Sequence, residues 1–436
     1  MTSEWIKFTD LLSAIVDNRG KTCPVGNSGL PLIATNCVTG TDLYPCYDTT
    51  RFVSEETYKT WFRGHPEPGD ILFVCKGSPG RTSLVPNPVN FCIAQDMVAV
   101  RADAKKVYPR YLFAALRSQV VRTQIDNMHV GTMIPHFKKG DFDKLLIPML
   151  EMKAQIAVGD LYFTISDRIT RLRETNKTLE AIAQAIFKSW FVDFDPVRAK
   201  MEGRQPEGMD EATAALFPDS FEESELGLVP KGWKISSLAE SCSYLKRGLS
   251  PKYLEKGGVL VLNQKCVRDF SIDFRKARRH DNSQRAIDGR TLEVGDVVVN
   301  STGVGTLGRV AQVLDLPETT TADSHLTIVR AGSTMSPAYL GEWMQKNQTL
   351  IESMGEGTTG QTELSRAKLG ELRLLAPPSA IQLEFSKIVQ PLKSKNVVNS
   401  HTSASLEAIR DTLLPRLISG QLRLPKAQEQ IENALT

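Results

Sequence analysis

The sequence predicts an α/β (α+β) protein built as a tandem repeat. Two globular domains are joined by two long antiparallel helices, with pseudo-twofold symmetry between the halves. Three observations predict this fold: residues of the first half recur in the second, each half begins with short β-like runs, and each half ends with a long helical stretch. The length of 436 residues also supports at least two domains, because one compact core rarely uses so many.

The repeat is visible as pairs of residues that recur in one order. Trp5 recurs as Trp233 and Tyr111 as Tyr339, each shifted by 228 positions. The other recurring segments lie at nearly the same offset: Arg19-Gly20 with Arg247-Gly248, Cys37-Val38 with Cys266-Val267, Gly69-Asp70 with Gly295-Asp296, and 179–182 with 406–409. Each match is weak alone, but the shared order and offset indicate a duplication.

Each half has the same order of predicted elements. Short apolar runs bounded by turn residues, such as 71–74 and 297–299, predict strands. Residues 155–191 and 382–418 predict helices, and prolines at 148 and 377–378 mark the breaks before them.

The two helical stretches carry a coiled-coil pattern, which is clear in the first and partial in the second. Apolar residues recur in alternating steps of three and four, with Asn176 as a polar position, whereas the middle of the second helix is polar around Asn396 and Asn399. The residues expected in a shared seam are Ile169, Leu172, Leu179, Ile182, Ile186, Leu406, Ile409 and Leu413. We expect the helices to pair antiparallel over roughly 60 Å. The alternative is that each helix packs onto its own domain.

The expected boundaries follow from these patterns. They are 1–150 for the first globular domain, 151–195 for the first helical spacer, 196–228 for an acidic connector, 229–378 for the second globular domain, 379–424 for the second helical spacer and 425–436 for a tail. Residues 193–225 hold ten acidic and three basic side chains, a net charge of −7. Because the whole chain has a net charge of +3, the remaining residues carry +10. A basic body beside an acidic segment is typical of a protein that binds a polyanion, and a merely solvated linker is the alternative.

Composition excludes several classes of protein. Hydrophobic residues make up 41% and charged residues 24%, which is ordinary for a globular protein. No apolar run approaches the roughly 20 residues that span a bilayer, and the N-terminus has no secretory pattern, so we expect no membrane association. Seven scattered cysteines without a C-x-x-C pair predict a reduced, cytoplasmic protein. The six histidines form no metal-binding motif.

Four longer segments carry a resemblance to a known family. They are 131–142 (GTMIPHFKKGDF), 189–205 (SWFVDFDPVRAKMEGRQ), 216–233 (LFPDSFEESELGLVPKGW) and 357–372 (GTTGQTELSRAKLGEL). Together with the repeat, they resemble the specificity subunits of type I restriction-modification systems from Trp5 to about Leu424.

The resemblance implies a DNA-binding subunit without catalysis of its own. Its globular domains would be target-recognition domains, each reading one part of a split sequence in double-stranded DNA. Its helices would dock two adenine-N6 methyltransferase (modification) subunits, and restriction/motor subunits would join through them. The resemblance implies no cofactor on this chain, because S-adenosylmethionine, ATP and magnesium belong to the partner subunits.

Two near-motifs for enzyme chemistry have simpler interpretations. Residues 303–308 (GVGTLG) match G-x-G-x-x-G after a strand-like run, but the following RVAQVL predicts a second strand where a dinucleotide site needs a helix, so we expect a β-hairpin. Asp195-Pro196-Val197 nearly matches the D-P-P-Y motif of adenine methyltransferases. It lacks the second proline and the aromatic residue against which such an enzyme stacks its flipped base. No phosphate-binding G-x-x-x-x-G-K-[ST] loop occurs.

Candidate DNA contacts come from basic and polar residues near predicted turns. Residues 268–285 carry six bases and three acids, and arginine suits both phosphates and guanine edges. The candidates are Arg19, Lys76, Arg81, Lys138, Lys139, Arg247, Lys265, Arg268, Arg275, Arg278, Arg279, Arg309 and Gln361. A solvated loop is the alternative for each.

Two other classes of function stay open on sequence alone. One is a stand-alone enzyme that uses a nucleotide or S-adenosylmethionine, which the absent motifs disfavour. The other is a structural adaptor whose globular domains bind protein. Retention on duplex DNA that weakens steeply with salt separates a DNA reader from such an adaptor.

Overall fold

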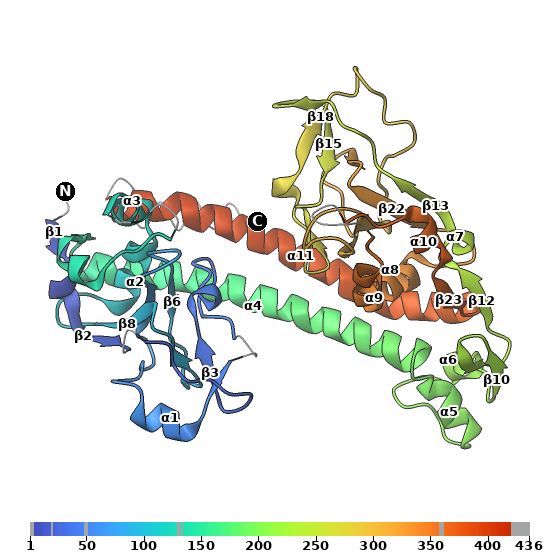
Figure 1. Ribbon diagram of the computed structural model, residues 1–436, viewed down its shortest axis with the longest axis horizontal. Helices are drawn as coiled ribbons and strands as arrows, with labels where there is room; N and C mark the ends of the chain where they lie inside the picture. Colours follow the sequence, from blue (N-terminus) through green and yellow to red (C-terminus); the bar gives the residue numbers. More distant parts are fainter. Residues whose placement is uncertain are drawn as a thin grey trace. The chain divides into compact units, whose positions relative to one another are not determined.

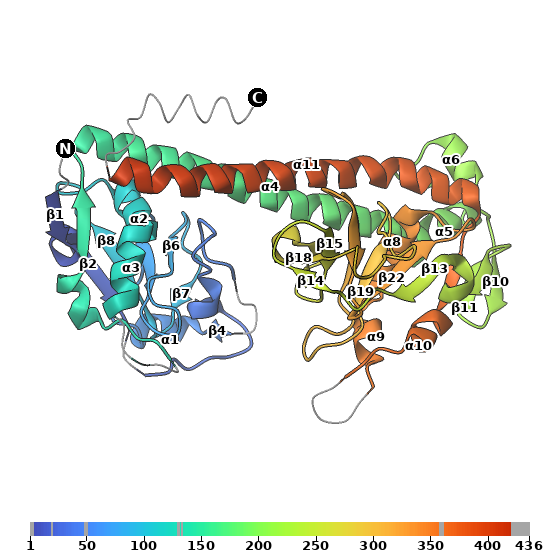
Figure 2. The same cartoon turned by 90° about the horizontal axis from the view of Figure 1, so that it is seen from above.

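The computed structural model describes residues 4–18, 21–47, 51–128, 131, 134–356 and 362–419 (Figures 1 and 2). The chain forms two compact units, the first from residues 1–174 and 400–436 and the second from 175–399. In the part that is described, no helix is both long and apolar enough to cross a membrane. All seven cysteines lie in the described part, and their thiols are free.

The described residues of the first unit's globular part form three small sheets and three α-helices. The order β2-β8-β5-β6 is antiparallel throughout, β3 pairs with β4 antiparallel and with β7 parallel, and β1 pairs with β9 antiparallel. The elements are β1 (Glu4–Lys7), η1 (Phe8–Leu11), β2 (Leu12–Asp17), β3 (Leu30–Ile33), η2 (Thr35–Cys37), β4 (Phe52–Val53), α1 (Glu55–Thr60), β5 (Ile71–Val74), β6 (Thr82–Leu84), β7 (Cys92–Ile93), β8 (Met97–Ala102), α2 (Pro109–Arg117), α3 (Gln119–Met128), η3 (Lys139–Lys144) and β9 (Leu146–Met149).

The second unit repeats this plan. The order β13-β22-β19-β20 is antiparallel, β15 pairs with β21 parallel, and β12 pairs with β23 antiparallel. The elements are β12 (Lys234–Ser237), α7 (Leu238–Ser241), β13 (Cys242–Arg247), β14 (Tyr253–Leu254), β15 (Val259–Leu262), β16 (Val267–Arg268), β17 (Ser271–Ile272), η4 (Phe274–Lys276), β18 (Arg278–His280), β19 (Val297–Asn300), β20 (Val310–Gln312), β21 (Thr320–Ala322), β22 (Leu326–Ala331), α8 (Pro337–Lys346), α9 (Gln348–Ser353), α10 (Arg366–Glu371) and β23 (Arg373–Ala376).

The recurring tyrosines and aspartates occupy equivalent buried positions, whereas Trp5 is exposed and its counterpart Trp233 is buried. The hydroxyl of Tyr111 donates to the carbonyl of Pro148 at 2.5 Å, and that of Tyr339 donates to the carbonyl of Leu375 at 2.6 Å. The recurring Gly-Asp segments are explained in the same way. Asp70 accepts from Arg101 at 2.8 Å, just as the equivalent aspartate of the second unit accepts from its own arginine. The duplication therefore preserves buried hydrogen bonds as well as sheet order.

The two long helices are α4 (Met152–Phe191) and α11 (Ser379–Ile418), and each contributes residues to both units. Each begins three residues before the sequence predicts. In the first unit, Leu406 of α11 packs against Ile165, Ile169 and Leu172 of α4. In the second unit, Phe385 of α11 packs against aromatic residues of α4.

This packing corrects part of the expected seam. Ile182 is 42% exposed, and the buried face of α4 in the second unit runs instead through Ala183, Phe187 and Trp190. Leu179 is half-buried, and Ile186 packs at the edge of that core. Ile409 and Leu413 pack instead with the first unit's globular core. Periodicity correctly marked an apolar face, but it did not show which residues of the two helices meet.

A polar layer crosses the helix pair within the second unit. The side-chain amide of Asn399 donates to Oδ1 of Asn176 at 2.9 Å, and Asn176 donates to the backbone carbonyl of Asn396 at 3.1 Å. Because a polar position is satisfied only by a matching partner, such a layer selects one register of two helices. The polar middle of the second helix is therefore part of the pairing.

The acidic connector is folded rather than a solvated linker. It contains α5 (Asp195–Met201), α6 (Glu211–Ala215) and the hairpin of β10 (Phe221–Ser224) with β11 (Gly227–Pro230). Its apolar residues enter the core of the second unit beside Trp190 and Trp233. Asp195-Pro196-Val197 thus begins a helix, and its valine is buried.

Candidate nucleic-acid interface

Each unit has a β-hairpin whose turn holds residues singled out in the sequence. The turn between β5 and β6 contains Lys76, and the turn between β19 and β20 contains residues 303–308. The antiparallel pairing of β19 with β20 confirms the hairpin predicted for this glycine-rich segment. All of residues 301–312 are described, and the helix N-terminus that a dinucleotide site requires does not follow the turn.

In the first unit, three segments meet at this turn. The backbone N–H of Cys75 donates to the carbonyl of Asp96 at 2.9 Å, and that of Phe137 donates to the carbonyl of Cys75 at 2.8 Å. Lys76 pairs with His136 in an isolated antiparallel bridge. We name Lys76, Asp96 and His136 the first loop junction. Two predicted candidates that lay far apart in the sequence, the turn and the IPHFKK segment, are thus brought together.

The second unit has the same arrangement with different side chains. The N–H of Ser301 donates to the carbonyl of His325 at 2.8 Å, and the N–H of Leu364 donates to the carbonyl of Ser301 at 2.8 Å. Thr302 pairs with Glu363 in the equivalent bridge. The loop after β15 joins them, because buried Asn300 donates to the carbonyl of Gln264 at 3.1 Å. We name Gln264, Thr302, His325 and Glu363 the second loop junction.

Close backbone approach explains one glycine of the repeat at this place. A Cβ on Gly248 would lie 2.0 Å from the carbonyl oxygen of Ala322 and 2.3 Å from that of Asp323. Only glycine therefore allows the end of β13 to pass this closely over the segment before His325. Burial raises the pKa of Asp323, although the backbone N–H of His325 donates to its carboxylate at 2.9 Å and opposes that rise.

The basic segment 268–285 is less positive than its composition suggests. Arg275 is paired with Asp273 at 2.9 Å and Arg268 with Asp269 at 3.4 Å. Burial raises the pKa of Asp273, but the bond from Arg275 and its charge outweigh burial and leave the pKa below its ordinary value. These arginines are already neutralised locally, which lowers their attraction for phosphate.

Arg278 and Arg279 differ although they are neighbours on β18. Arg279 makes two bonds to Glu318 at 2.6 and 2.7 Å, and the bond lowers the pKa of that carboxyl. Arg278 is exposed and lies 3.4 Å from the ring centre of Tyr253. No carboxylate in the described part of the chain forms an ion pair with Arg278. A guanidinium stacked on an aromatic ring keeps its charge and loses conformational freedom, so Arg278 is prepared for an anionic partner.

The remaining candidates divide by their partners. Lys76, Lys138 and Lys265 are exposed. Lys139 forms an ion pair with Asp17, and Arg247 pairs with Glu363 at 2.7 Å while donating to the carbonyl of Leu364 at 3.0 Å. Arg309 donates to the carbonyl of Gly305 at 2.8 Å, and half-buried Arg81 packs against Gly40. Arg19 and Gln361 lie outside the described residues.

Sequence reasoning missed Gln264, Thr302 and His325. Their positions are separated by 38 and 23 residues, and only the fold brings them together. The repeat held one signal, because His325 and Asp96 each directly precede an equivalent strand, β22 and β8.

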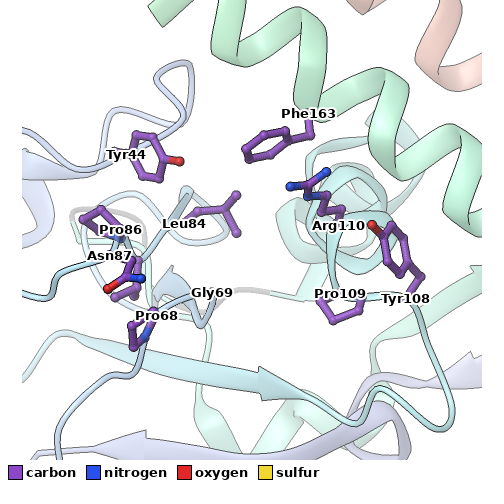
Figure 3. Close-up of a pocket in the computed structure, with 11 residues that line it drawn as sticks. Tyr44, Pro68, Gly69, Leu84, Pro86, Asn87, Tyr108, Pro109, Arg110 and Phe163 are labelled. Atoms are coloured by element: carbon purple, nitrogen blue, oxygen red, sulfur yellow. The ribbon is translucent and has the colours of Figure 1, made fainter.

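The first unit also has a half-open cavity of about 420 Å³. Figure 3 shows Tyr44, Leu84 and Pro86 on one side and Arg110 with Tyr108 on the other. Asp160 accepts from both Arg110 and the Tyr108 hydroxyl at 2.7 Å, and the guanidinium of Arg110 stacks on a phenylalanine ring. This cation is already paired, so the cavity is poorly suited to an anionic ligand. Elsewhere in the described part, no three His, Cys, Asp or Glu side chains cluster as metal ligands would.

Comparison with known proteins identifies similar sequences and a similar fold. No family model matches the chain. The type I restriction enzyme HindI specificity subunit of Haemophilus influenzae is 24% identical over 407 residues, covering 81% of this chain and 86% of that protein. The MjaIX specificity subunit of Methanocaldococcus jannaschii is 22% identical, covering 82% and 78%.

The solved structures extend the likeness to the fold. The type I restriction-modification S subunit from M. genitalium matches with a TM-score of 0.59 and 15% identity, over 95% of this chain and 96% of that one. This match shows a shared mixed fold of helices and sheets. The resemblance drawn from the sequence is thus confirmed: over most of its length, the chain is similar to type I restriction enzyme specificity subunits.

Proposed function

We propose that this chain is the sequence-specific DNA-binding subunit of a type I restriction-modification complex, with each unit reading one part of a bipartite target. The observation that carries the proposal is the pair of equivalent units in a chain similar to specificity subunits over most of its length. Equivalent hairpin turns and loop junctions give each unit its own polar surface. Their different side chains suit two different half-sites.

The domain boundaries drawn from the sequence belong to this proposal. Residues 1–150 and 229–378 act as target-recognition domains, and the long helices act as antiparallel spacers. Partner methyltransferase subunits dock on the helices, and restriction/motor subunits join through them. Exposed Val398 and Leu383 on α11 show that a helix already packed on one face keeps apolar residues on another. S-adenosylmethionine, ATP and magnesium are assigned to the partners.

The electrostatics support phosphate contact by a few defined cations rather than by a broad basic surface. Exposed Lys76 and Lys138 belong to the turn and the segment that meet at the first loop junction, and Arg278 is stacked on Tyr253 in the second unit. Phosphate contacts position a protein on DNA, whereas hydrogen bonds to base edges select the sequence. The proposed interface therefore combines these cations with the polar groups of the junctions.

The test is reconstitution with a cognate methyltransferase subunit. The purified chain alone should transfer no methyl group from S-adenosylmethionine to DNA. Addition of the methyltransferase should give N6-methyladenine at one split sequence, mapped by sequencing a random duplex library. Exchanging this chain for another specificity subunit, with the same methyltransferase, should change that sequence. Methyl transfer by this chain alone, or a sequence that stays the same after the exchange, would contradict the proposal.

A further inference from the structure

Three polar side chains of the second loop junction form one continuous hydrogen-bonded set. The hydroxyl of Thr302 donates to Oε1 of Gln264 at 3.4 Å, and the hydroxyl oxygen of Thr302 lies 2.7 Å from Nδ1 of His325. Gln264 and Thr302 are half-buried and His325 is exposed. The set therefore lies at the surface. The hydroxyl of Thr302, Oε1 of Gln264 and Nδ1 of His325 already take part in hydrogen bonds within it.

The short contact to Thr302 suits one tautomer of the histidine. When the hydroxyl proton of Thr302 is directed to Oε1 of Gln264, Thr302 accepts from Nδ1–H of His325. In the neutral ring the other nitrogen, Nε2, is then a bare acceptor. The same bond uses the carbonyl oxygen of Gln264 and leaves its amide N–H groups as donors.

The backbone around the set is held in place. A Cβ on Gly303 would lie 2.6 Å from Oε1 of Gln264, so this glycine admits the glutamine side chain. Asn300, which is fully buried, donates to the carbonyls of Gln264 and Thr306 at 3.1 and 3.0 Å and so ties two loops together. Asp323 accepts from the N–H of His325 at 2.9 Å and fixes the third loop. A rigid support of this kind is what precise readout requires.

We propose that Gln264 and His325 read one base of the second half-site by presenting a donor and an acceptor to its major-groove edge, with Thr302 as the positioning residue. This inference rests on the proposed function. Adenine carries the complementary pair, because its N7 accepts a hydrogen bond and its N6 amine donates one. Gln264 donates to N7, and Nε2 of His325 accepts from the amine.

The first unit provides the contrast. Its equivalent junction holds Lys76 at the position of Thr302 and Asp96 at that of His325, as the matching backbone bonds show. A lysine is only a donor and an ionised carboxylate only an acceptor, so this set is not the same reader. Changes in the second junction should therefore leave the first half-site unaltered.

The experiment uses the complex with its methyltransferase and maps N6-methyladenine on a random duplex library. Gln264→Ala and His325→Ala should each lower the preference for adenine at one position of the second half-site by roughly tenfold or more. Thr302→Val should lower the same preference, because Thr302 positions His325 and Gln264 although it does not contact the base itself. Gln284→Ala is the matched control, because Gln284 is exposed in the same unit and donates to Asp281 outside the junction.

The outcomes separate this inference from the proposed function. If the unaltered complex methylates no split sequence, the proposed function fails before any variant is considered. If it does, and correctly folded Gln264→Ala and His325→Ala proteins keep the original preference, the readout proposal is overturned. It is also overturned if methylation falls equally at all sequences, since that result indicates phosphate contact, or if the relaxed position selects a base other than adenine.

Discussion

At the scale of single residues, the partner of a side chain decides what its type can do. The sequence placed Arg278 and Arg279 in one class because they are adjacent and basic. The structure separates them, since Arg279 is held by Glu318 while Arg278 stacks on Tyr253. No sequence pattern shows this, because Glu318 lies 39 residues from its arginine.

Arg278→Ala should weaken DNA binding through the second unit nearly uniformly across sequences. If the guanidinium contacts one phosphate, the slope of log affinity against log salt should fall by about one. The control is the double variant Arg279→Ala with Glu318→Ala, which removes one cation and one anion and so keeps the net charge. Fluorescence anisotropy on duplex DNA across a salt series measures both. Equal salt slopes for Arg278→Ala and the unaltered protein would exclude the phosphate contact.

A buried ion cluster offers a second prediction at this scale. Lys393 of α11 contacts Glu342 of α8 at 2.5 Å and Glu180 of α4 at 3.2 Å, and the Glu342 side chain is fully buried. Removing the cation leaves a buried carboxylate without a charge partner, although the side-chain amide of Gln184 still donates to it. We expect Lys393→Ala to lower the free energy of unfolding by about 3–5 kcal/mol. Glu342→Gln added to it should recover much of that loss, while Lys387→Ala, an exposed pair with Glu384, should cost less than about 1 kcal/mol.

The pH dependence of the Lys393→Ala protein follows from the same cluster. Burial raises the pKa of Glu342, and Lys393 opposes that rise, so the variant should have a still higher pKa there. A group whose folded pKa is raised binds its proton more tightly in the folded state. The unfolding free energy of the variant should therefore fall as pH rises from the ordinary glutamate pKa through the raised folded value. Denaturant unfolding between about pH 5 and about pH 8 tests this. An unfolding free energy of the variant that rises with pH over this range would contradict it.

At the scale of elements, the sequence predicted both long helices closely but not which of their residues meet. Their start and end are encoded locally by prolines and by apolar period. The partner of each residue depends on the other helix, more than two hundred positions away, and on where polar residues must meet. Asn176 and Asn399 form such a meeting point. Leu406 consequently packs against Ile169 rather than against Leu179, its counterpart in the recurring segments 179–182 and 406–409. The acidic connector shows the same limit, since its few apolar residues outweigh its charge in deciding that it folds.

A double-mutant cycle tests this register. Leu406 and Ile169 are 4% and 2% exposed in one cluster, so each alanine substitution should cost about 2–5 kcal/mol. Residues in contact couple, so we expect a coupling energy of at least about 0.5 kcal/mol between them. Leu406→Ala combined with Leu179→Ala should be additive, and exposed Ile182→Ala should cost little. Coupling confined to the Leu406 and Leu179 pair would favour the register that the sequence alone suggests.

At the scale of the whole molecule, the duplication is what the sequence predicts best. Recurring tyrosines and aspartates fulfil equivalent buried roles, and these roles constrain residue type strongly. The polar junction residues are not constrained in this way, because their roles differ between units. For this reason the fold could be predicted from recurring residues, while Gln264, Thr302 and His325 could not be found before three loops were seen to converge.

The final prediction follows from the independence of the two units. Each has its own sheets, core and loop junction, so each should read its half-site without the other. Replacing residues 1–150 by the matching domain of a related specificity subunit should change only one half of the methylated sequence. Inserting residues into the helical spacers should instead keep both half-sites and alter the unread gap between them. Mapping of N6-methyladenine with a common methyltransferase measures both effects. If exchanging the first domain alters both half-sites together, the units are not separate readers, because a change confined to one sheet system would then have to act through the other.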